Sequence, residues 1–566
     1  MIIYTEIRWL ILFIFFLLIV ILNYGDTMKK NTFINGAFIT TLGILLSKVL
    51  GIIYVSPFYG IIGEVGGALY GYAYTIYLLF MSISSAGIPL AISKLVSEYQ
   101  ALGYYNAKQR VFFLGKRIAL LLGFICFLII MFFAPLFASL ILGDVVGGNT
   151  ISDVSFVIRV IGIAILVVPV LSIYRGYFEG HRFMNPPSIS QVIEQIVRVS
   201  IIIIGSYLSI KLFKFKIHMT VGVALLGATI GSFVSYLYLY IKKAKNKNKF
   251  QEKIIKVNEP IINDKIIIKK IFYYAIPFIL IDVFKYFYNY VDMVSVVKNL
   301  VHYASFKVID AESIYGMLST WANKFNMIVV AISTGIMVSL IPNLTESIVK
   351  NQEKTANAKI NQAFILLLYF TIPMTLGISF LSFPIWNLFY GYNVFGSSVL
   401  SYYIFVGFFS GLVNVGIIIL QVLKDYRAVF ISLVSGLILK ILLNTKLLIY
   451  FYKINLPAYY GVITASILGF LLSFIVSILY LRIKYRISFE KLIKCFIEIM
   501  CGSIFMIIIL FIMSIFLPLY SHNKVISFII MAIYILVGSF VYLIYSYKTG
   551  LFKNVFGRNF IKKNKE

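Results

Sequence analysis

The feature of this sequence that most constrains its fold is a series of about fourteen apolar runs, each long enough to span a lipid bilayer. Backbone groups without hydrogen bonds are costly in hydrocarbon, so a spanning chain must form helices or a closed barrel. The runs are stretches of Ile, Leu and Phe without the alternation of barrel strands, which favours helices. They lie at approximately 36–58, 69–96, 118–142, 155–177, 188–210, 217–241, 271–296, 313–341, 360–388, 399–421, 428–451, 459–481, 492–517 and 525–547.

Basic residues collect in the even-numbered connections between these runs and in the tail after Lys548. The even side holds roughly thirty of them against roughly seven on the odd side. Because positively charged loops stay in the cytoplasm, we expect a multi-pass protein of the bacterial plasma membrane with both ends of the helical core in the cytoplasm. The net charge of +29 then reflects loops beside anionic lipid headgroups rather than nucleic-acid binding.

The longest polar stretch, residues 242–270, follows the sixth run and is rich in lysine. It predicts a basic cytoplasmic linker between an amino-terminal lobe of spans one to six (28–241) and a carboxyl-terminal lobe of spans seven to twelve (271–491). Spans thirteen and fourteen, with a basic cytoplasmic tail, occupy 492–566. A loop that serves only to set the topology is the alternative interpretation of 242–270.

Residues 1–27 do not fit a fourteen-helix bundle. Their apolar run at 9–23 is short for a span, and its flank with Glu6 and Arg8 does not resemble a signal peptide with a cleavage site. We therefore expect the native chain to begin at Met28, which makes residues 1–27 a mis-called extension. A peripheral helix against the first lobe is the alternative.

Charged side chains inside the runs are the best indicators of function, because such residues are rare in hydrocarbon and usually face a polar interior. In the fifth run, Glu194 and Arg198 lie one helical turn apart. The seventh run carries Asp282, Lys285 and Asp292 on one stripe. Each acid–base pair can bind a ligand or simply lock helices together, and both interpretations stay open at this point.

Lys48 in the first run and Lys324 in the eighth have no carboxylate three or four residues away. A cation-lined cavity for an anionic ligand explains them better than helix locking does. The sequence therefore predicts a substrate-binding set of Lys48, Lys324, Lys94, Arg175, Glu194, Arg198 and Lys285. Asp282 and Asp292 are candidates for a coupling Na⁺ or proton.

Sequence motifs of covalent chemistry are absent. The chain has no P-loop, no HExxH and no GxSxG, its histidines show no ligand-like spacing, and its three cysteines lack CxxC spacing. Nothing polar is long enough to form a nucleotide-binding domain. We expect neither an enzyme nor an ATP-driven pump, and no cofactor or metal.

Several segments in register resemble one known family. SKVLGIIYVSPFYG, YRGYFEGHRFMNPPSISQVIEQIVR, YGMLSTWANKF and SLIPNLTES are similar to the SpoVB/YtgP branch of polysaccharide flippases, which includes the MurJ-like lipid II flippases of the multidrug/oligosaccharidyl-lipid/polysaccharide (MOP) superfamily. The resemblance runs from about Met28 to the end. It implies fourteen helices in two lobes around a central cationic cavity, with Lys48 and Lys324 contacting the substrate diphosphate. It also implies a groove for the polyprenyl tail at spans thirteen and fourteen, while at about Tyr54 the chain departs from a basic position of the family.

These observations predict a flippase that moves an undecaprenyl-diphosphate-linked cell-wall precursor, foremost lipid II, from the inner to the outer leaflet by alternating access without ATP hydrolysis. Membrane lipids and the cell-wall synthesis machinery are the expected partners. One alternative is a flippase for another lipid-linked glycan, such as a capsule or teichoic-acid unit. A second is a multidrug/cation antiporter on the same fold, which would favour an acidic cavity, and a third is a non-transporting scaffold.

Overall fold

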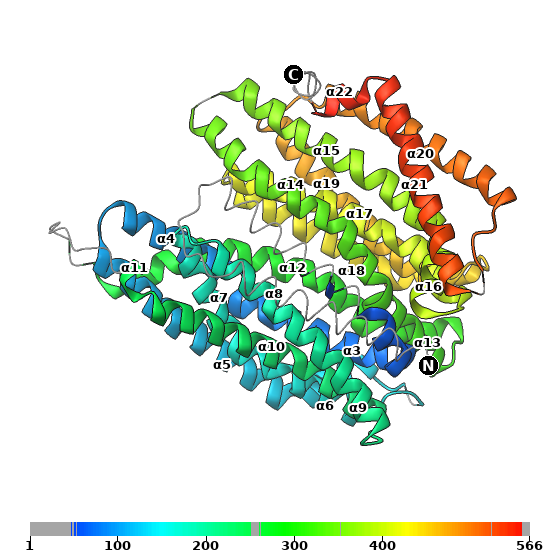
Figure 1. Ribbon diagram of the computed structural model, residues 1–566, viewed down its shortest axis with the longest axis horizontal. Coiled ribbons are helices and arrows are strands. Elements are labelled where there is room, and N and C mark those ends of the chain that lie inside the picture. The colour runs from blue at the N-terminus through cyan, green and yellow to red at the C-terminus, as the bar shows by residue number, and fades with distance from the viewer. Residues whose placement is uncertain are drawn as a thin grey trace. The chain divides into compact units, whose positions relative to one another are not determined.

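The computed structural model describes residues 54–145, 147–250, 260, 262–350, 352–521 and 523–556, together with residues 47, 50 and 51. Over these ranges the chain is helical apart from short connections (Figure 1). Contacts within the chain divide it into two compact units, Met1–Thr320 and Trp321–Glu566. The predicted all-α fold is therefore confirmed for the described part of the chain.

The first unit is built from long helices with short breaks. Its elements are α3 (Val55–Ser85), α4 (Ile88–Ala101), α5 (Tyr105–Leu142), α6 (Ile151–Gly162), α7 (Ala164–Gly180), α8 (Asn185–Ser200), the π-helix η1 (Ile201–Gly205), α9 (Ser206–Lys211), α10 (Ile217–Lys245), α11 (Lys247–Phe250), α12 (Asp264–Ala304) and α13 (Val308–Gly316). The π-helix η2 (Met317–Ala322) contains the border between the units.

The core of the first unit forms where α4, α5, α7 and the start of α12 meet. Along α4 the buried residues include Ile88, Ile92, Leu95 and Tyr99, which are spaced three or four apart and so lie on one helical face. That face packs against α7 and α5, and α10 packs against both α7 and α8. This packing brings residues of α7, α8 and α10 to one place.

A glycine separates α3 from α4, at the break that the Gly87-Ile88-Pro89 sequence predicts. Gly87 has a φ of 72°, in the left-handed region that side chains with a Cβ rarely adopt. A Cβ on Gly87 would lie 2.6 Å from the backbone oxygen of Ala275 in α12. The break therefore needs glycine both for its backbone angle and for the close approach of α12.

The second unit has nine helices in the part that the structure describes. They are α14 (Asn323–Val349), α15 (Glu353–Phe380), α16 (Ser382–Tyr390), α17 (Val394–Val422), α18 (Tyr426–Lys453), α19 (Ala458–Ile483), α20 (Glu490–Phe516), α21 (Lys524–Lys548) and α22 (Leu551–Phe556). Helix α17 packs against α14, α15 and α19, while α18 packs along α19. Helix α15 in turn contacts α20, which packs against α21.

Eleven stretches of helix in the described residues are long and apolar enough to cross a membrane, as a multi-pass membrane protein requires. They coincide with eleven of the fourteen predicted spans. The seventh and eighth predicted spans fall on α12 and on α13 to α14, which are not among the eleven, and most of the first lies outside the described residues. The number fourteen therefore stays a prediction.

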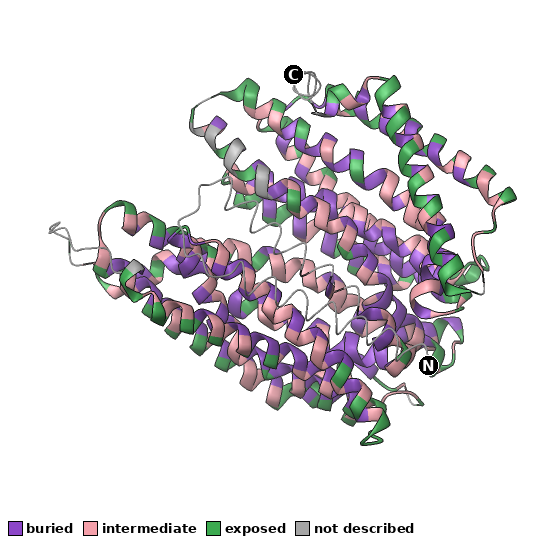
Figure 2. Cartoon of the chain, in the orientation of Figure 1, coloured by how far each residue is buried: buried purple, intermediate pink, exposed green. Residues whose placement is uncertain are grey.

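Large apolar side chains lie exposed on several helices, and Figure 2 colours many residues of α20 and α21 as exposed. Phe132 on α5, Phe516 on α20 and Leu536 on α21 are exposed over 74%, 83% and 69% of their surface. In water such a surface would be a strong drive to associate, whereas in a bilayer lipid chains cover it. The exposure pattern agrees with a membrane protein.

The division into units differs from the predicted lobes. The prediction starts the second lobe at 271, but α12 packs against α3, α4 and α5, so contacts assign it to the first unit. Local composition identifies the polar stretch 242–270, but it does not indicate which helices α12 packs against. Residues 1–27, Lys48, and residues 251–259 and 261 of the predicted linker lie outside the described residues.

Candidate functional site

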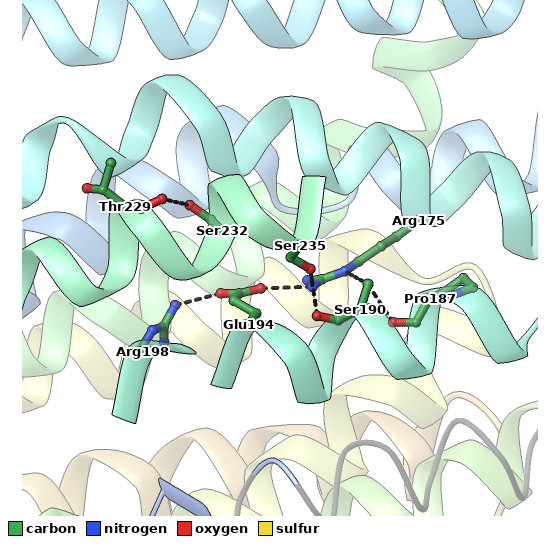
Figure 3. Close-up of polar contacts among 8 residues, drawn as sticks. All are labelled: Arg175, Pro187, Ser190, Glu194, Arg198, Thr229, Ser232 and Ser235. Atoms are coloured by element: carbon green, nitrogen blue, oxygen red, sulfur yellow. Dashed lines mark hydrogen bonds and ion pairs between the residues drawn. The ribbon is translucent and has the colours of Figure 1, made fainter. Parts of the chain in front are cut away.

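Three charged side chains of the first unit meet at the junction of α7 and α8. Glu194 accepts from Arg198 at 2.6 Å, one helical turn along α8, and from Arg175 of α7 at 2.8 Å. Figure 3 shows the Glu194 carboxylate between the two guanidinium groups. The three side chains keep only 14% to 18% of their surface exposed. We call these residues the Arg-Glu-Arg cluster.

Hydroxyl groups complete the cluster. Arg175 Nε donates to Ser190 Oγ at 2.9 Å, and Arg175 Nη2 lies 3.3 Å from Ser235 Oγ on α10. Ser235 Oγ donates to the Ser190 backbone oxygen at 2.6 Å, and Ser190 Oγ to that of Pro187 at 2.7 Å (Figure 3). Buried guanidinium groups need such partners to offset their desolvation. The network fixes Arg175 across three helices.

Helix α10 can approach this cluster because it carries small residues there. A Cβ on Gly231 would lie 2.7 Å from the Glu194 backbone oxygen, and one on Gly227 would lie 2.9 Å from that of Arg198. Small residues allow helix backbones in membranes to come close and support interhelical hydrogen bonds. The spacing of Gly227 and Gly231, one turn apart, therefore seats α10 on α8.

The cluster carries two positive charges against one negative charge. The contact between Glu194 and Arg198 is the helix-locking pair that the sequence allowed, and it is present. Arg175 adds a second cation, so the three groups retain a net positive charge in a mostly buried place. An anionic ligand would balance that charge if the cluster binds substrate. Nearby dipoles would balance it if the cluster is structural. The assignment of Arg175, Glu194 and Arg198 to substrate binding stays a prediction.

Tyrosines of α3 form a ladder close to Arg198. Tyr70 and Tyr74 stack with ring centroids 5.4 Å apart, and Tyr77 follows at 5.6 Å from Tyr74. All three lie within electrostatic range of the Arg198 guanidinium. Aromatic faces and hydroxyls beside a cation can hold polar groups inside a membrane protein. This ladder extends the polar region from α8 to α3.

The predicted stripe on α12 holds a loose pair. Lys285 Nζ lies 3.9 Å from Asp282 Oδ1, which is longer than a hydrogen bond, and both side chains are about one-third exposed or more. Asp292 follows on the same helix and makes an interaction of its own. Lys94 is placed elsewhere, with its ammonium 3.8 Å above the Tyr274 ring. This contact places Lys94 of α4 against α12.

The remaining predicted lysines divide between described and undescribed residues. Lys324 lies half-buried on α14, directly after the π-helix η2, and it has interaction partners. Lys48 lies outside the described residues. Sequence reasoning left Lys440 out of the site, although the structure buries it completely on α18, donating to Ser466 Oγ at 2.7 Å and to the Val462 oxygen at 3.1 Å. The position of Lys440 in the middle of the predicted span 428–451 could have identified it.

An apolar pocket of about 470 Å³ opens in the second unit. It is lined by α14, α15, α16, α20 and α21, with no charged side chain among its lining residues. Tyr542 of α21 forms part of the wall and donates to the Tyr369 oxygen of α15 at 3.0 Å, and the Tyr369 hydroxyl lies 3.0 Å from Ser546 Oγ. We call this pocket the apolar groove. It lies partly on the last two predicted spans, where the family resemblance implies a lipid-tail groove.

Among the described residues, no group of three His, Cys, Asp or Glu side chains could hold a metal ion. Cys126 and Cys495 are buried, and Cys501 is exposed. The polar groups form ion pairs and hydrogen bonds between helices.

Comparisons with known proteins agree on one family and one fold. A family model described as a polysaccharide biosynthesis protein matches residues 33–347. The lipid II flippase MurJ of Bacillus subtilis (strain 168) is 32% identical over 539 residues, which cover 94% of this chain and 97% of that protein. The stage V sporulation protein B of the same organism is 29% identical over 214 residues, 38% of this chain and 39% of that protein.

Solved structures show the same arrangement of helices. A lipid II flippase MurJ in an inward closed conformation matches with a TM-score of 0.60 and 20% identity, over 91% of this chain and 99% of the other. An inward-facing MATE multidrug transporter of the MOP superfamily matches with a TM-score of 0.59 and 13% identity, over 83% of this chain and 98% of the other. The chain shares its fold with these two proteins and belongs to the polysaccharide biosynthesis protein family.

Proposed function

We propose that this protein is a flippase that moves an undecaprenyl-diphosphate-linked cell-wall precursor, namely lipid II, from the inner to the outer leaflet of the bacterial plasma membrane without ATP hydrolysis. The similarity to the Bacillus subtilis lipid II flippase along almost the whole length of both chains carries the proposal. The protein is a transporter and performs no covalent chemistry.

The apolar groove supports a lipid-linked substrate. A polyprenyl tail must stay in hydrocarbon while its charged headgroup crosses, because a bare charge in hydrocarbon is very costly. No charged side chain lines the groove, and its helices α20 and α21 carry large exposed apolar side chains. It offers such a tail a continuous place beside the protein.

Cations inside the spans support an anionic headgroup. The Arg-Glu-Arg cluster keeps a net positive charge, and Lys324 is half-buried on α14. In this proposal Lys48 and Lys324 contact the diphosphate, and the polar residues of α8 and α12 hold the sugars. An antiporter for cationic drugs would instead need an excess of buried carboxylates.

Direction can come from the membrane potential. With basic loops in the cytoplasm, the diphosphate carries roughly two negative charges outward, which is worth about 4 to 5 kcal/mol per 100 mV. Asp282 and Asp292 on α12 are the candidates for additional coupling to Na⁺ or protons.

A reconstituted transport assay tests the proposal. Purified protein in liposomes should move fluorescent lipid II between leaflets faster than protein-free liposomes do, and it should restore growth of a flippase-depleted strain. Movement of another undecaprenyl-linked glycan but not of lipid II would reassign the substrate. Export of a cationic dye without any lipid movement would instead identify a drug antiporter, and no transport in either assay would leave a scaffold.

A further inference from the structure

Two ion pairs fasten the start of α12 to the first unit. Lys270 on α12 lies 2.9 Å from Glu98 on α4. Arg110 on α5 donates through Nε to Asp264 at 2.8 Å and through Nη1 to the Ile262 backbone oxygen at 2.9 Å. All four charged side chains are one-third to one-half exposed. The pairs are therefore partly exposed to solvent, and each one joins α12 to a different neighbouring helix.

An apolar seam also holds the start of α12 on its neighbours. Ile267, Ile271 and Ala275 are fully buried and spaced four residues apart, so they face the same way along α12. They belong to the same core cluster as Leu95 and Val96 of α4. Hydrophobic burial is strong but non-directional, so this seam alone would let α12 rotate or slide.

The ion pairs supply the missing direction. Asp264 and Lys270 are six residues apart, which is about 9 Å along a helix, and they contact two different helices. Two polar contacts at separate heights and on separate neighbours define both the rotation and the height of α12. The Lys94 ammonium above the Tyr274 ring adds a third contact of this kind.

The chain just before α12 is also held on α5. The Phe250 ring is buried among Tyr177, Phe178 and Phe183, and its backbone oxygen accepts from Lys108 of α5 at 3.3 Å. Phe250 and Ile262 therefore both accept hydrogen bonds from the amino-terminal part of α5, the first from Lys108 and the second from Arg110.

We propose that the Glu98–Lys270 and Arg110–Asp264 pairs are positioning contacts that hold the start of α12 on α4 and α5 throughout transport, and so fix where Asp282 and Lys285 lie. The proposal rests on the flippase function. The start of α12 then acts as a fixed part of the first unit, and no step of transport separates it from α4.

Charge reversal tests the role of one pair. Glu98→Lys should lower the rate of lipid II movement in liposomes several-fold, because it places two cations together. The double variant Glu98→Lys with Lys270→Glu restores an attraction with the same net charge, and it should recover most of the rate. The control is Lys269→Glu, which makes the Lys270→Glu change at the exposed neighbouring position. This variant should leave the rate unchanged. Failure of the double variant to recover would overturn the positioning role.

Cross-linking tests whether the contact stays closed. Cys126, Cys495 and Cys501 are first replaced by Ala, and Glu98→Cys is combined with Lys270→Cys. The double-cysteine protein should transport slowly, and a short bifunctional thiol reagent should restore the rate by replacing the ion pair with a covalent link. Arrest of transport by the reagent would mean that α4 and α12 must separate, which contradicts the proposal.

The proposed function and the positioning role can fail separately. Cross-linking yield in native membranes reports the closeness of α4 and α12 without any substrate. A high yield with no lipid II movement by the unmodified protein would reject the flippase proposal alone. A low yield in a protein that flips lipid II would reject the positioning proposal alone.

Discussion

Arg175 Nη2 on α7 lies 2.8 Å from Glu194 Oε2 on α8, so this ion pair joins two helices. Arg198, from the same helix as Glu194, shares the carboxylate. One acid therefore compensates two bases in a mostly buried place, and removing it would leave two guanidinium groups without their partner. This imbalance makes Glu194 the residue on which the stability of the cluster depends.

Glu194→Ala should lower the free energy of unfolding by about 3 kcal/mol, because breaking a buried ion pair by removing one partner leaves an uncompensated charge. Thermal unfolding in detergent measures the change. Gln191→Ala, one turn earlier on α8, serves as the control and should melt close to the unmodified protein. Equal melting of the two variants would contradict the dependence on Glu194.

Lys324→Ala should abolish growth of a flippase-depleted strain while membrane abundance stays near normal, and Lys48→Ala should do the same. Each removes a cation that the proposed function assigns to the substrate diphosphate, and a charged contact made inside a membrane protein is hard to replace. Complementation and immunoblotting measure the two quantities. Lys491→Ala removes an exposed lysine of α20 as the control, and normal growth of the Lys324 and Lys48 variants would remove both residues from the site.

Asp292→Asn should preserve expression but remove any dependence of lipid II movement on a Na⁺ or proton gradient, because the amide cannot carry the compensating charge. Transport in liposomes with and without an imposed gradient measures this. Glu353→Gln, an exposed acid on α15, provides the matched control. Gradient dependence that survives the Asp292 change would assign this residue to contacts between helices instead.

The spans could be predicted from the sequence because each run is long and apolar enough for its own hydropathy to decide its fate. The packing partners of helix α12 could not be predicted in this way. Its packing on α4 and α5 depends on Ile267, Ile271 and Ala275 meeting a complementary face, and no local pattern states which helix will provide that face. The contacts therefore divide the chain at Thr320 and Trp321, and the lobe boundary at 271 stays a prediction.

The sequence predicts Arg175, Glu194 and Arg198 as site residues, but it predicts a contact only between the two that share a helix. Glu194 and Arg198 are four residues apart, so helical periodicity pairs them directly. Arg175 is 19 residues from Glu194 in the sequence, and Ser235 is 60 residues from Arg175. Helix packing brings them together, and sequence spacing does not encode this packing. Ser190 was within reach of prediction, since it precedes Glu194 by one turn.

Gly377→Phe should slow lipid II movement by filling the apolar groove. Gly377 lines the groove, and a Cβ there would meet no atom within 4 Å, so a side chain can begin at this position without a clash and extend into the groove. The liposome assay measures the rate. Gly335→Phe is the control, because Gly335 is exposed on α14 with equal space but does not line the groove. Equal rates for the two variants would argue against a role of the groove in holding the lipid tail.

Asp425 gives the second unit a stability that depends on pH. Its carboxylate lies between two spans, accepts from Lys484 Nζ at 2.6 Å and from Tyr485 at 3.1 Å, and caps α18 through the Ala428 N–H. Burial alone would raise the pKa of Asp425, but the hydrogen bonds from Lys484, Ala428 and Tyr485 outweigh it and lower the pKa below its ordinary value.

Asp425→Asn isolates this charge, because Asn caps helices about as well as Asp. At pH 7 the variant should be less stable by about 1 kcal/mol, a modest value because the Lys484 side chain is 56% exposed. A lowered folded-state pKa means that the contribution is complete above about pH 4 and is lost as the pH falls through the folded-state value. Melting curves of both proteins in detergent from pH 7 to pH 3 should therefore converge at the acid end, and Asp310→Asn, at an exposed position, should show no such convergence. A difference that persists unchanged to pH 3 would mean that the Asp425 charge is not its source.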